Sequence, residues 1–201
     1  MTLPNKLTLF RIVLVPVMVI VAFIPALHTP IFGGAMSLAN LINLIIFIVA
    51  SSTDFLDGYL ARKNNLVTTF GKFADPLADK LLVISAMIIL CLQINEMQPA
   101  NAWYLPGWVI IAILCREFIV SGIRLVSVER GKVIPAGWTG KIKTATTMIA
   151  LIFLFLYEIP IGGIAIFGIV GAILMYLALI FTIISGVEYF WKNRQFILES
   201  I

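Results

Sequence analysis

The sequence has few charged residues, and it has little that a disulfide-based or zinc-based scaffold would need. Of the 201 residues, 12% are charged and 61% are hydrophobic, whereas about 25% of the residues of a soluble domain are charged. There is one histidine, and Cys91 and Cys115 each stand alone within an apolar segment without metal-type spacing. No useful run alternates polar and apolar residues, which excludes a fold built mainly on sheets.

Long apolar segments take the place of the missing charges. A helix needs roughly 20 predominantly apolar residues to cross the hydrocarbon core of a bilayer. Six segments are long enough, and stretches containing Pro, Gly, Asn or His separate them. We therefore expect an all-α integral membrane protein with one domain over residues 1–201. The expected transmembrane helices lie at about 9–27, 36–62, 70–94, 105–130, 140–158 and 161–190.

The basic residues indicate how the chain is oriented, because Lys and Arg flank membrane spans preferentially on the cytoplasmic side. They gather before the first segment, in alternate connections and after the last segment: Lys6, Arg11, Arg62, Lys63, Lys72, Arg130, Lys132, Lys141, Lys143, Lys192 and Arg194. The other connections carry only His28, Glu96 and Glu158. Both termini should therefore be cytoplasmic, in a multi-pass protein of the cell membrane.

Two other interpretations of these charges are weaker. A cleaved signal peptide in place of the first helix lacks a clear A-x-A cleavage site and would leave an odd number of spans. The net charge of +4 follows mostly from the topology and suits an anionic membrane surface, so it implies no nucleic acid partner.

Four aspartates lie where the second and third segments meet. A carboxylate at the centre of a membrane helix costs roughly 2.5–3.5 kcal/mol, so it normally faces the bundle interior or a water-filled cavity. Helical geometry groups two acids with small residues and a cation on one face of the second segment, and two acids with a glycine on one face of the third. These residues are Asp54, Asp57, Gly58, Ala61 and Arg62, followed by Gly71, Asp75 and Asp79.

The two faces together predict a metal-binding carboxylate cluster. Four carboxylates would repel one another unless they bound cations, and oxygen ligands without His or Cys favour Mg²⁺, Mn²⁺ or Ca²⁺. Mg²⁺ usually binds through carboxylates together with substrate phosphates, and a metal pair can hold both the attacking and the leaving oxygen. The cluster therefore predicts a phosphate-bearing substrate. A solvated acidic face outside the membrane and small-residue helix packing are the alternatives.

The signature formed by these residues resembles that of the CDP-alcohol phosphotransferase family. Residues 54–79 read D-x2-D-G-x2-A-R-x8-G-x3-D-x3-D, which matches at all eight positions and at every gap. The resemblance implies a reaction with Mg²⁺ or Mn²⁺, two ions in all, in which an alcohol attacks the lipid-side phosphorus of a CDP-linked lipid and CMP leaves. It implies that Asp54, Asp57 and Asp75 bind metal, and that Asp79 completes the second metal site and acts as general base. The residues implied for the CDP pocket are Gly58, Ala61, Arg62 and Gly71, with Asn5, Thr8 and Arg11 at its cytidine end.

Basic residues of the fourth and fifth segments favour an anionic acceptor. Arg116 lies 14 residues before Arg130, or roughly 21 Å along a helix, so it should be well inside the membrane. A basic pocket beside the carboxylates would bind an acceptor phosphate, and its candidate residues are Arg116, Arg124, Lys141 and Lys143. The alternatives are an ion pair of Arg116 with Glu117, and topology or lipid headgroup contacts for the others.

Four further segments resemble the bacterial phosphatidylglycerophosphate synthase branch of that family: PNKLTLFRI, GKFADPLADKLL, CREFIVSGIR and AGWTGKIKTATTM. The resemblance implies transfer of the phosphatidyl group from CDP-diacylglycerol to glycerol 3-phosphate at a site facing the cytoplasm, in a homodimer. The alternative acceptors are phosphatidylglycerol, inositol phosphate and serine. An ion transporter is a different class, but it would favour interrupted helices and paired repeats. The small residues of GGIAIFGIVGA suit either helix packing or a subunit contact.

Overall fold

The computed structural model describes residues 3–31, 35–63, 69–129 and 137–198. Within these ranges only the helical backbone is described at 3–4, 54–63, 69–73, 75–76, 125–126, 128–129 and 195–198. The helices are α1 (Leu3–Phe23), α2 (Leu38–Lys63), α3 (Thr69–Met97), α4 (Gly107–Glu129), α5 (Trp138–Phe155) and α6 (Ile166–Leu198). Two 3₁₀-helices, η1 (Pro25–His28) and η3 (Pro99–Tyr104), and two short strands, β1 (Pro30–Ile31) and β2 (Met36–Ser37), connect them.

Six helices form where the six apolar segments lie, with shifted ends. The first helix begins and ends earlier than expected, because it includes the polar residues around Asn5 and stops before Pro25, which opens η1. The last helix continues to Leu198, since hydropathy marks only its apolar part. At 1.5 Å per residue its 33 residues extend about 50 Å, well beyond a hydrocarbon core of roughly 30 Å.

Four helical segments are long and apolar enough to cross a membrane, by length and composition: Asn5–Phe23, Leu77–Met97, Pro99–Arg124 and Ile166–Arg194. The shorter apolar segment Leu38–Thr53 of α2 precedes the aspartate signature in the same helix. Large apolar side chains are exposed on the outside of the bundle, including Phe23, Ile111, Phe118 and Ile183. Such a surface needs a lipid solvent, so the protein is embedded in a membrane.

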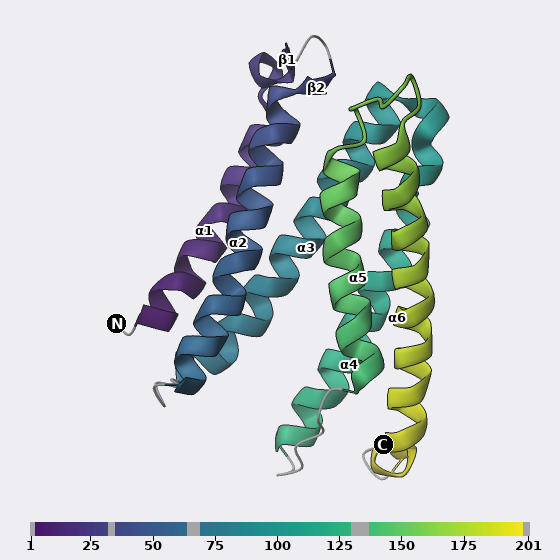
Figure 1. The fold of residues 1–201 in the computed structure, drawn as a ribbon. Coiled ribbons are helices and arrows are strands. Elements are labelled where there is room, and N and C mark those ends of the chain that lie inside the picture. The colour runs from purple at the N-terminus through teal and green to yellow at the C-terminus, as the bar shows by residue number, and fades with distance from the viewer. Residues whose placement is uncertain (1–2, 32–34, 64–68, 130–136, 199–201) are drawn as a thin grey trace.

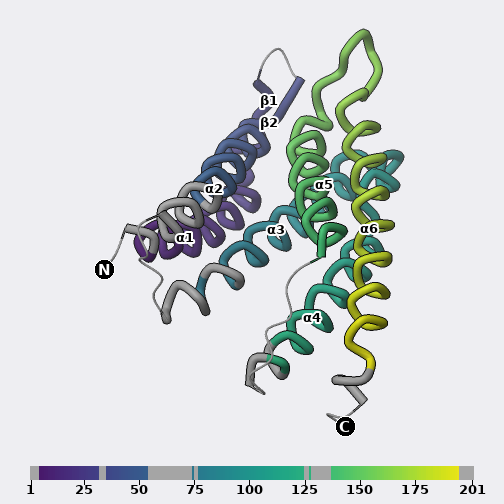
Figure 2. Tube along the Cα trace, turned by 60° about the horizontal axis from the view of Figure 1, so that its bottom comes forward, coloured from purple at the N-terminus to yellow at the C-terminus, as the bar shows by residue number. Residues whose placement is uncertain are grey.

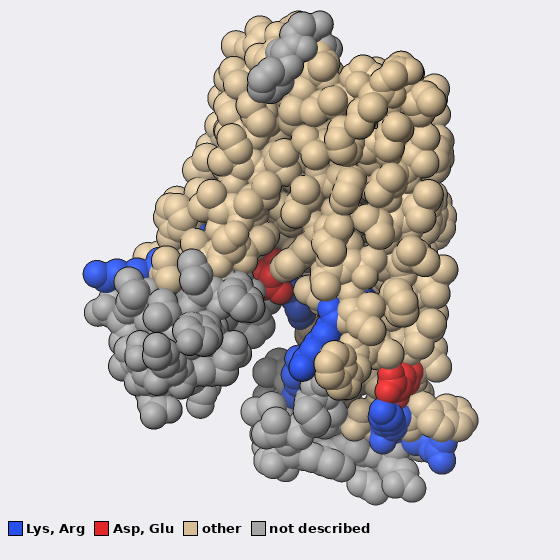
Figure 3. All heavy atoms as spheres, in the orientation of Figure 1, with Lys and Arg blue, Asp and Glu red and all other residues tan. Residues whose placement is uncertain are grey.

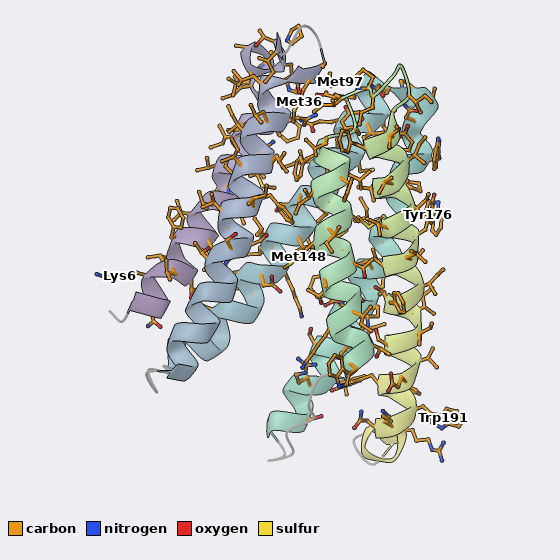
Figure 4. The ribbon with its side chains drawn as sticks, viewed as in Figure 1. Lys6, Met36, Met97, Met148, Tyr176 and Trp191 are labelled. Atoms are coloured by element: carbon orange, nitrogen blue, oxygen red, sulfur yellow. The ribbon has the colours of Figure 1, made fainter. Side chains whose placement is uncertain are left out.

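The helices form two groups joined by α3. Helices α1 and α2 lie side by side, α5 packs along α6, and α3 extends from the first group toward the second (Figures 1 and 2). Helix α4 packs against α6 and α3. Both chain termini lie at one end of the bundle, here called the terminal end, and the strands lie at the other, here called the hairpin end. Lys6 and Trp191 lie toward the terminal end, and Met36 and Met97 lie at the hairpin end (Figure 4).

Two glycines of α6 explain how closely this helix packs. A Cβ atom at Gly168 would lie 2.3 Å from the Tyr104 ring, and one at Gly171 would lie 3.0 Å from the backbone nitrogen of Leu154 in α5. These small residues therefore serve helix packing inside the chain, one of the two interpretations of GGIAIFGIVGA.

A partly buried polar contact holds the hairpin end together. The carboxylate of Glu158, between α5 and α6, accepts hydrogen bonds from the backbone nitrogen of Ser37 (2.6 Å) and from its hydroxyl (3.3 Å). The Tyr157 hydroxyl also donates to Glu158 (3.3 Å). Because Ser37 immediately precedes α2, this carboxylate links the two helical groups at the end opposite to the aspartate signature.

Candidate functional site

The aspartate signature occupies the terminal end of two neighbouring helices. Asp54 and Asp57 lie near the end of α2, and Asp75 and Asp79 lie near the start of α3. These helices contact each other, so the backbone brings the two halves of the signature to one end of the bundle (Figure 1). The side chain of Asp79 is described. The structure does not describe the side chains of five signature residues, so their predicted roles lie outside the described part of the chain: Asp54, Asp57, Ala61, Arg62 and Asp75. For Gly58 and Gly71 it describes only the helical backbone.

A pocket opens beside Asp79, between α3, α4 and α5. Its polar residues are Asp79, Lys80, Glu117, Lys143, Thr144 and Thr147, and its apolar residues are Val83, Ile84, Met87, Ile113 and Leu114. Figure 3 shows acidic and basic side chains close together at the terminal end of the molecule. Asp79 is ten residues from the start of α3, or roughly 15 Å along the helix, so the pocket reaches inward from that end.

Glu117 connects three helices at this pocket. One oxygen of its carboxylate, Oε1, accepts from Arg116 Nη1 (3.1 Å) in α4 and forms an ion pair with Lys143 of α5. Arg116 Nη2 also donates to the Ser185 hydroxyl of α6 (2.8 Å). The side chains of Arg116, Glu117 and Lys143 are 16%, 19% and 10% exposed. Two cations thus share one carboxylate oxygen in a largely buried place.

A close approach of α6 positions Arg116. A Cβ atom at Gly186 would lie 3.1 Å from Cγ of Arg116 and 3.6 Å from its Nε, so the arginine stem passes directly beneath this glycine. The guanidinium is thereby directed to Glu117 and Ser185. Arg116 does not line the pocket itself, but it holds one carboxylate that does.

Lys80 reaches across from α3 to α4, where its ammonium donates to the Ser121 hydroxyl. Arg116 and Arg124 are close enough to repel it electrostatically, and Asp79 is close enough to attract it. Lys143 of α5 lines the same pocket and is close enough to repel Lys80 electrostatically.

The four cations predicted to bind an acceptor phosphate do not all lie at the pocket. Lys143 lines the pocket, Arg116 supports it through Glu117, and Arg124 is exposed near Lys80. Lys141 is two residues from Lys143, but its ammonium lies 5.2 Å from the centre of the exposed Trp138 ring. Residues two apart on a helix differ by about 200° in direction, so the structure does not bring Lys141 to the pocket.

The residues predicted for the cytidine end share a face of α1 against α2. Thr8 and Arg11 are buried, Asn5 is half-buried, and each of the three has a polar or electrostatic partner. Arg11 Nε donates to the backbone oxygen of Ala50 (3.3 Å). Ala50 is one helical turn before Asp54, so this face of α1 lies next to the first half of the signature.

Sequence reasoning did not single out Lys80, Ser121 or Ser185. The position of Lys80 directly after Asp79 could have identified it as a candidate site residue. The two serines had none, because a single hydroxyl in an apolar helix satisfies its own backbone as readily as it binds a neighbour. Their partners are defined only by the way α4 packs against α3 and α6.

Comparison with known proteins gives a consistent result over nearly the whole chain. A model of the CDP-alcohol phosphatidyltransferase family matches residues 1–184. A Bacillus subtilis protein named CDP-diacylglycerol–glycerol-3-phosphate 3-phosphatidyltransferase is 45% identical over 200 residues, which cover 98% of both chains. A Rickettsia felis protein of the same name is 40% identical and covers 96% of both chains. A Mycobacterium tuberculosis protein named probable phosphatidylglycerophosphate synthase is 38% identical over 93% of this chain and 79% of its own.

Proposed function

Because the chain belongs to the CDP-alcohol phosphatidyltransferase family, we propose that it transfers the phosphatidyl group of CDP-diacylglycerol to glycerol 3-phosphate. The products are phosphatidylglycerophosphate and CMP, so the protein is an enzyme of phospholipid biosynthesis. The observation that carries this proposal is that Asp79, the last residue of the signature, and Lys143 line the same pocket. A carboxylate that can accept a proton and a cation that can bind a phosphate thus face one space.

The proposed topology has six helices spanning the cell membrane, with both termini and the pocket on the cytoplasmic side. It is supported by four helices of sufficient length and hydropathy, by the common end of the two termini, and by the basic residues at that end (Figure 3). In this orientation glycerol 3-phosphate enters from the cytoplasm and the acyl chains of the liponucleotide stay in the bilayer. We propose one domain over residues 1–201, and a homodimer on the strength of the family resemblance alone.

Two divalent ions, Mg²⁺ or Mn²⁺, fit the donor set of the signature. Carboxylate oxygens are the ligands these ions prefer, and all four aspartates belong to the adjoining ends of α2 and α3. We propose that Asp54, Asp57, Asp75 and Asp79 hold them. Bound there, the ions would neutralise the charge of the pyrophosphate and of the leaving CMP.

The liponucleotide site is proposed next to these carboxylates. The backbone of α2 and α3 near Gly58, Ala61 and Gly71 would allow a close approach of the CDP group, and Arg62 would contact phosphate. Asn5, Thr8 and Arg11 would frame the cytidine, an assignment supported by the contact of Arg11 with α2.

The acceptor reacts at the pocket between α3, α4 and α5. Lys143 binds its phosphate, with Arg124 at the exposed rim and Arg116 acting through Glu117. Lys141 would have to leave Trp138 to contribute. Asp79 takes the proton from the primary hydroxyl of glycerol 3-phosphate, and that oxygen attacks the phosphorus bearing diacylglycerol. The bond between this phosphorus and the CMP oxygen breaks, and no covalent enzyme intermediate forms.

The test is an acceptor panel with purified protein, CDP-diacylglycerol and Mg²⁺. CMP release is measured with glycerol 3-phosphate, inositol phosphate, serine and phosphatidylglycerol. We expect release with glycerol 3-phosphate alone, and its loss in Asp79→Asn. Release with phosphatidylglycerol instead would identify a cardiolipin synthase and overturn the assignment of the basic pocket, and no release with any acceptor would overturn the whole proposal.

A further inference from the structure

Three cations, Lys80, Lys143 and Arg116, lie in or directly beside the pocket, against two described carboxylates, Asp79 and Glu117. Two lysines line it, Lys80 from α3 and Lys143 from α5, and they are close enough to repel each other. Glu117 is already shared by Lys143 and Arg116 through a single oxygen. Asp79 attracts both lysines and can balance one of them. Ionic groups inside a membrane protein are costly unless they are paired, so this arrangement favours a bound anion.

The ammonium group of Lys80 is positioned to bind such an anion. Its ammonium donates to the hydroxyl of Ser121, which is neutral and therefore leaves the positive charge in place. An ammonium carries three donors, so the same group can hold Ser121 and a phosphate oxygen together. The hydrogen bond also fixes a flexible four-carbon side chain across the gap between α3 and α4, which lowers the entropy lost when a ligand binds.

A phosphate monoester matches this pair of lysines. It carries a charge of about −1.5 to −2 at pH 7 and three strong acceptor oxygens. Placed between Lys80 and Lys143, it would replace the repulsion of the two ammonium groups by two attractions. Hydrogen bonds between ionised partners are also about twice as strong as neutral ones.

We propose that Lys80 is a further binding residue for the phosphate of the acceptor, opposite Lys143, and that the Ser121 hydroxyl positions its ammonium. This inference rests on the proposed function and deepens it, because it adds a second cationic wall to the acceptor site. Lys80 directly follows Asp79 in α3. A phosphate bound by Lys80 thus keeps the free hydroxyl of the same small molecule near the carboxylate that takes its proton.

The experiment compares the kinetics of four variants with those of the wild-type enzyme: Lys80→Gln, Lys80→Arg, Ser121→Ala and Lys192→Gln. Lys192 is a matched control, because it loses the same charge at an exposed place where it pairs with Glu188 (2.5 Å). KM and kcat are measured separately for glycerol 3-phosphate and for CDP-diacylglycerol. Inorganic phosphate, added as a competitor of glycerol 3-phosphate, probes the phosphate contact without the glycerol.

In Lys80→Gln we expect KM for glycerol 3-phosphate to rise about 10- to 100-fold, the usual effect of losing a charged hydrogen bond. The inhibition constant of inorganic phosphate should rise with it, while KM for CDP-diacylglycerol stays within about twofold. Lys80→Arg should recover part of the loss, since it restores the charge. Ser121→Ala keeps the charge and should raise KM for glycerol 3-phosphate by only about threefold, and Lys192→Gln should match wild type.

Three results would overturn the inference. The first is an unchanged KM for glycerol 3-phosphate in Lys80→Gln. The second is an equal rise in KM for both substrates, which would indicate a structural role. The third is a rise in that KM without any change in inhibition by inorganic phosphate. Wild-type protein that releases no CMP with glycerol 3-phosphate would overturn the proposed function itself, so the two failures are distinguishable.

Discussion

Replacing Glu117 with glutamine removes the carboxylate that Arg116 and Lys143 share. Oε1 of Glu117 accepts from Arg116 Nη1 at 3.1 Å and pairs with Lys143. Glutamine has nearly the same shape, so the substitution tests the charge rather than the packing. Two cations from α4 and α5 would then face each other without the group that attracts both.

The size of the effect follows from burial. Breaking a buried ion pair by removing one partner costs about 3–5 kcal/mol, whereas exposed pairs contribute about 0–1 kcal/mol. The three side chains are only 10–19% exposed, so the cost should be near the buried limit, at roughly 3 kcal/mol. For a chain of this length, that corresponds to a fall of about 6–12 °C in the midpoint of thermal unfolding.

The assay is thermal unfolding of the purified protein in detergent, with Glu188→Gln as the matched control. Glu188 also pairs with a lysine, Lys192, but that lysine is 68% exposed, so the control should unfold at the wild-type temperature. A Glu117→Gln midpoint within the error of wild type would refute the argument. So would a double variant, Glu117→Gln with Lys143→Gln, that is no more stable than Glu117→Gln, because removing the second cation should relieve the repulsion.

Three further predictions address packing, acceptor binding and proton transfer. Gly168→Ala should destabilise the protein by about 1–3 kcal/mol in the same unfolding assay, because the new methyl group would lie 2.3 Å from the buried Tyr104 ring; an unchanged midpoint would contradict the close packing of α6. Lys143→Gln should raise KM for glycerol 3-phosphate about tenfold or more. Lys141→Gln removes a contact with Trp138 and should raise that KM far less. Equal effects of the two substitutions would indicate that Lys141 also binds the acceptor. Asp79→Asn should lower kcat by about 10²-fold or more while Mn²⁺ and CDP-diacylglycerol binding fall less, and equal losses of turnover and binding would count against Asp79 as the base.

The helices were predictable because their cause is local. An apolar run of about 20 residues has only one way to satisfy its backbone in lipid, which is to form a helix. Six helices accordingly lie in the six predicted segments. Their ends were less predictable, since α6 continues to Leu198 through residues that hydropathy does not mark.

The signature was predictable for a different reason. Its spacing places Asp54 with Asp57, and Asp75 with Asp79, on single helix faces, and the short connection makes α2 and α3 neighbours. The metal-binding roles of these residues stay predictions. Of the four cations predicted to bind an acceptor phosphate, Lys143 lines the pocket that the described side chains form, and the binding roles of all four stay predictions.

The sequence by itself determined the membrane solvent, the helical segments and the two aspartate pairs, because each depends on residues close together in the chain. Only the tertiary structure decided that Lys80 crosses from α3 to Ser121, that Glu117 joins Arg116 to Lys143, and that α6 supports this arginine beneath Gly186. These contacts connect α3, α4, α5 and α6. They depend on how each helix is rotated about its axis and on how closely neighbouring helices pack. No single helix contains that information.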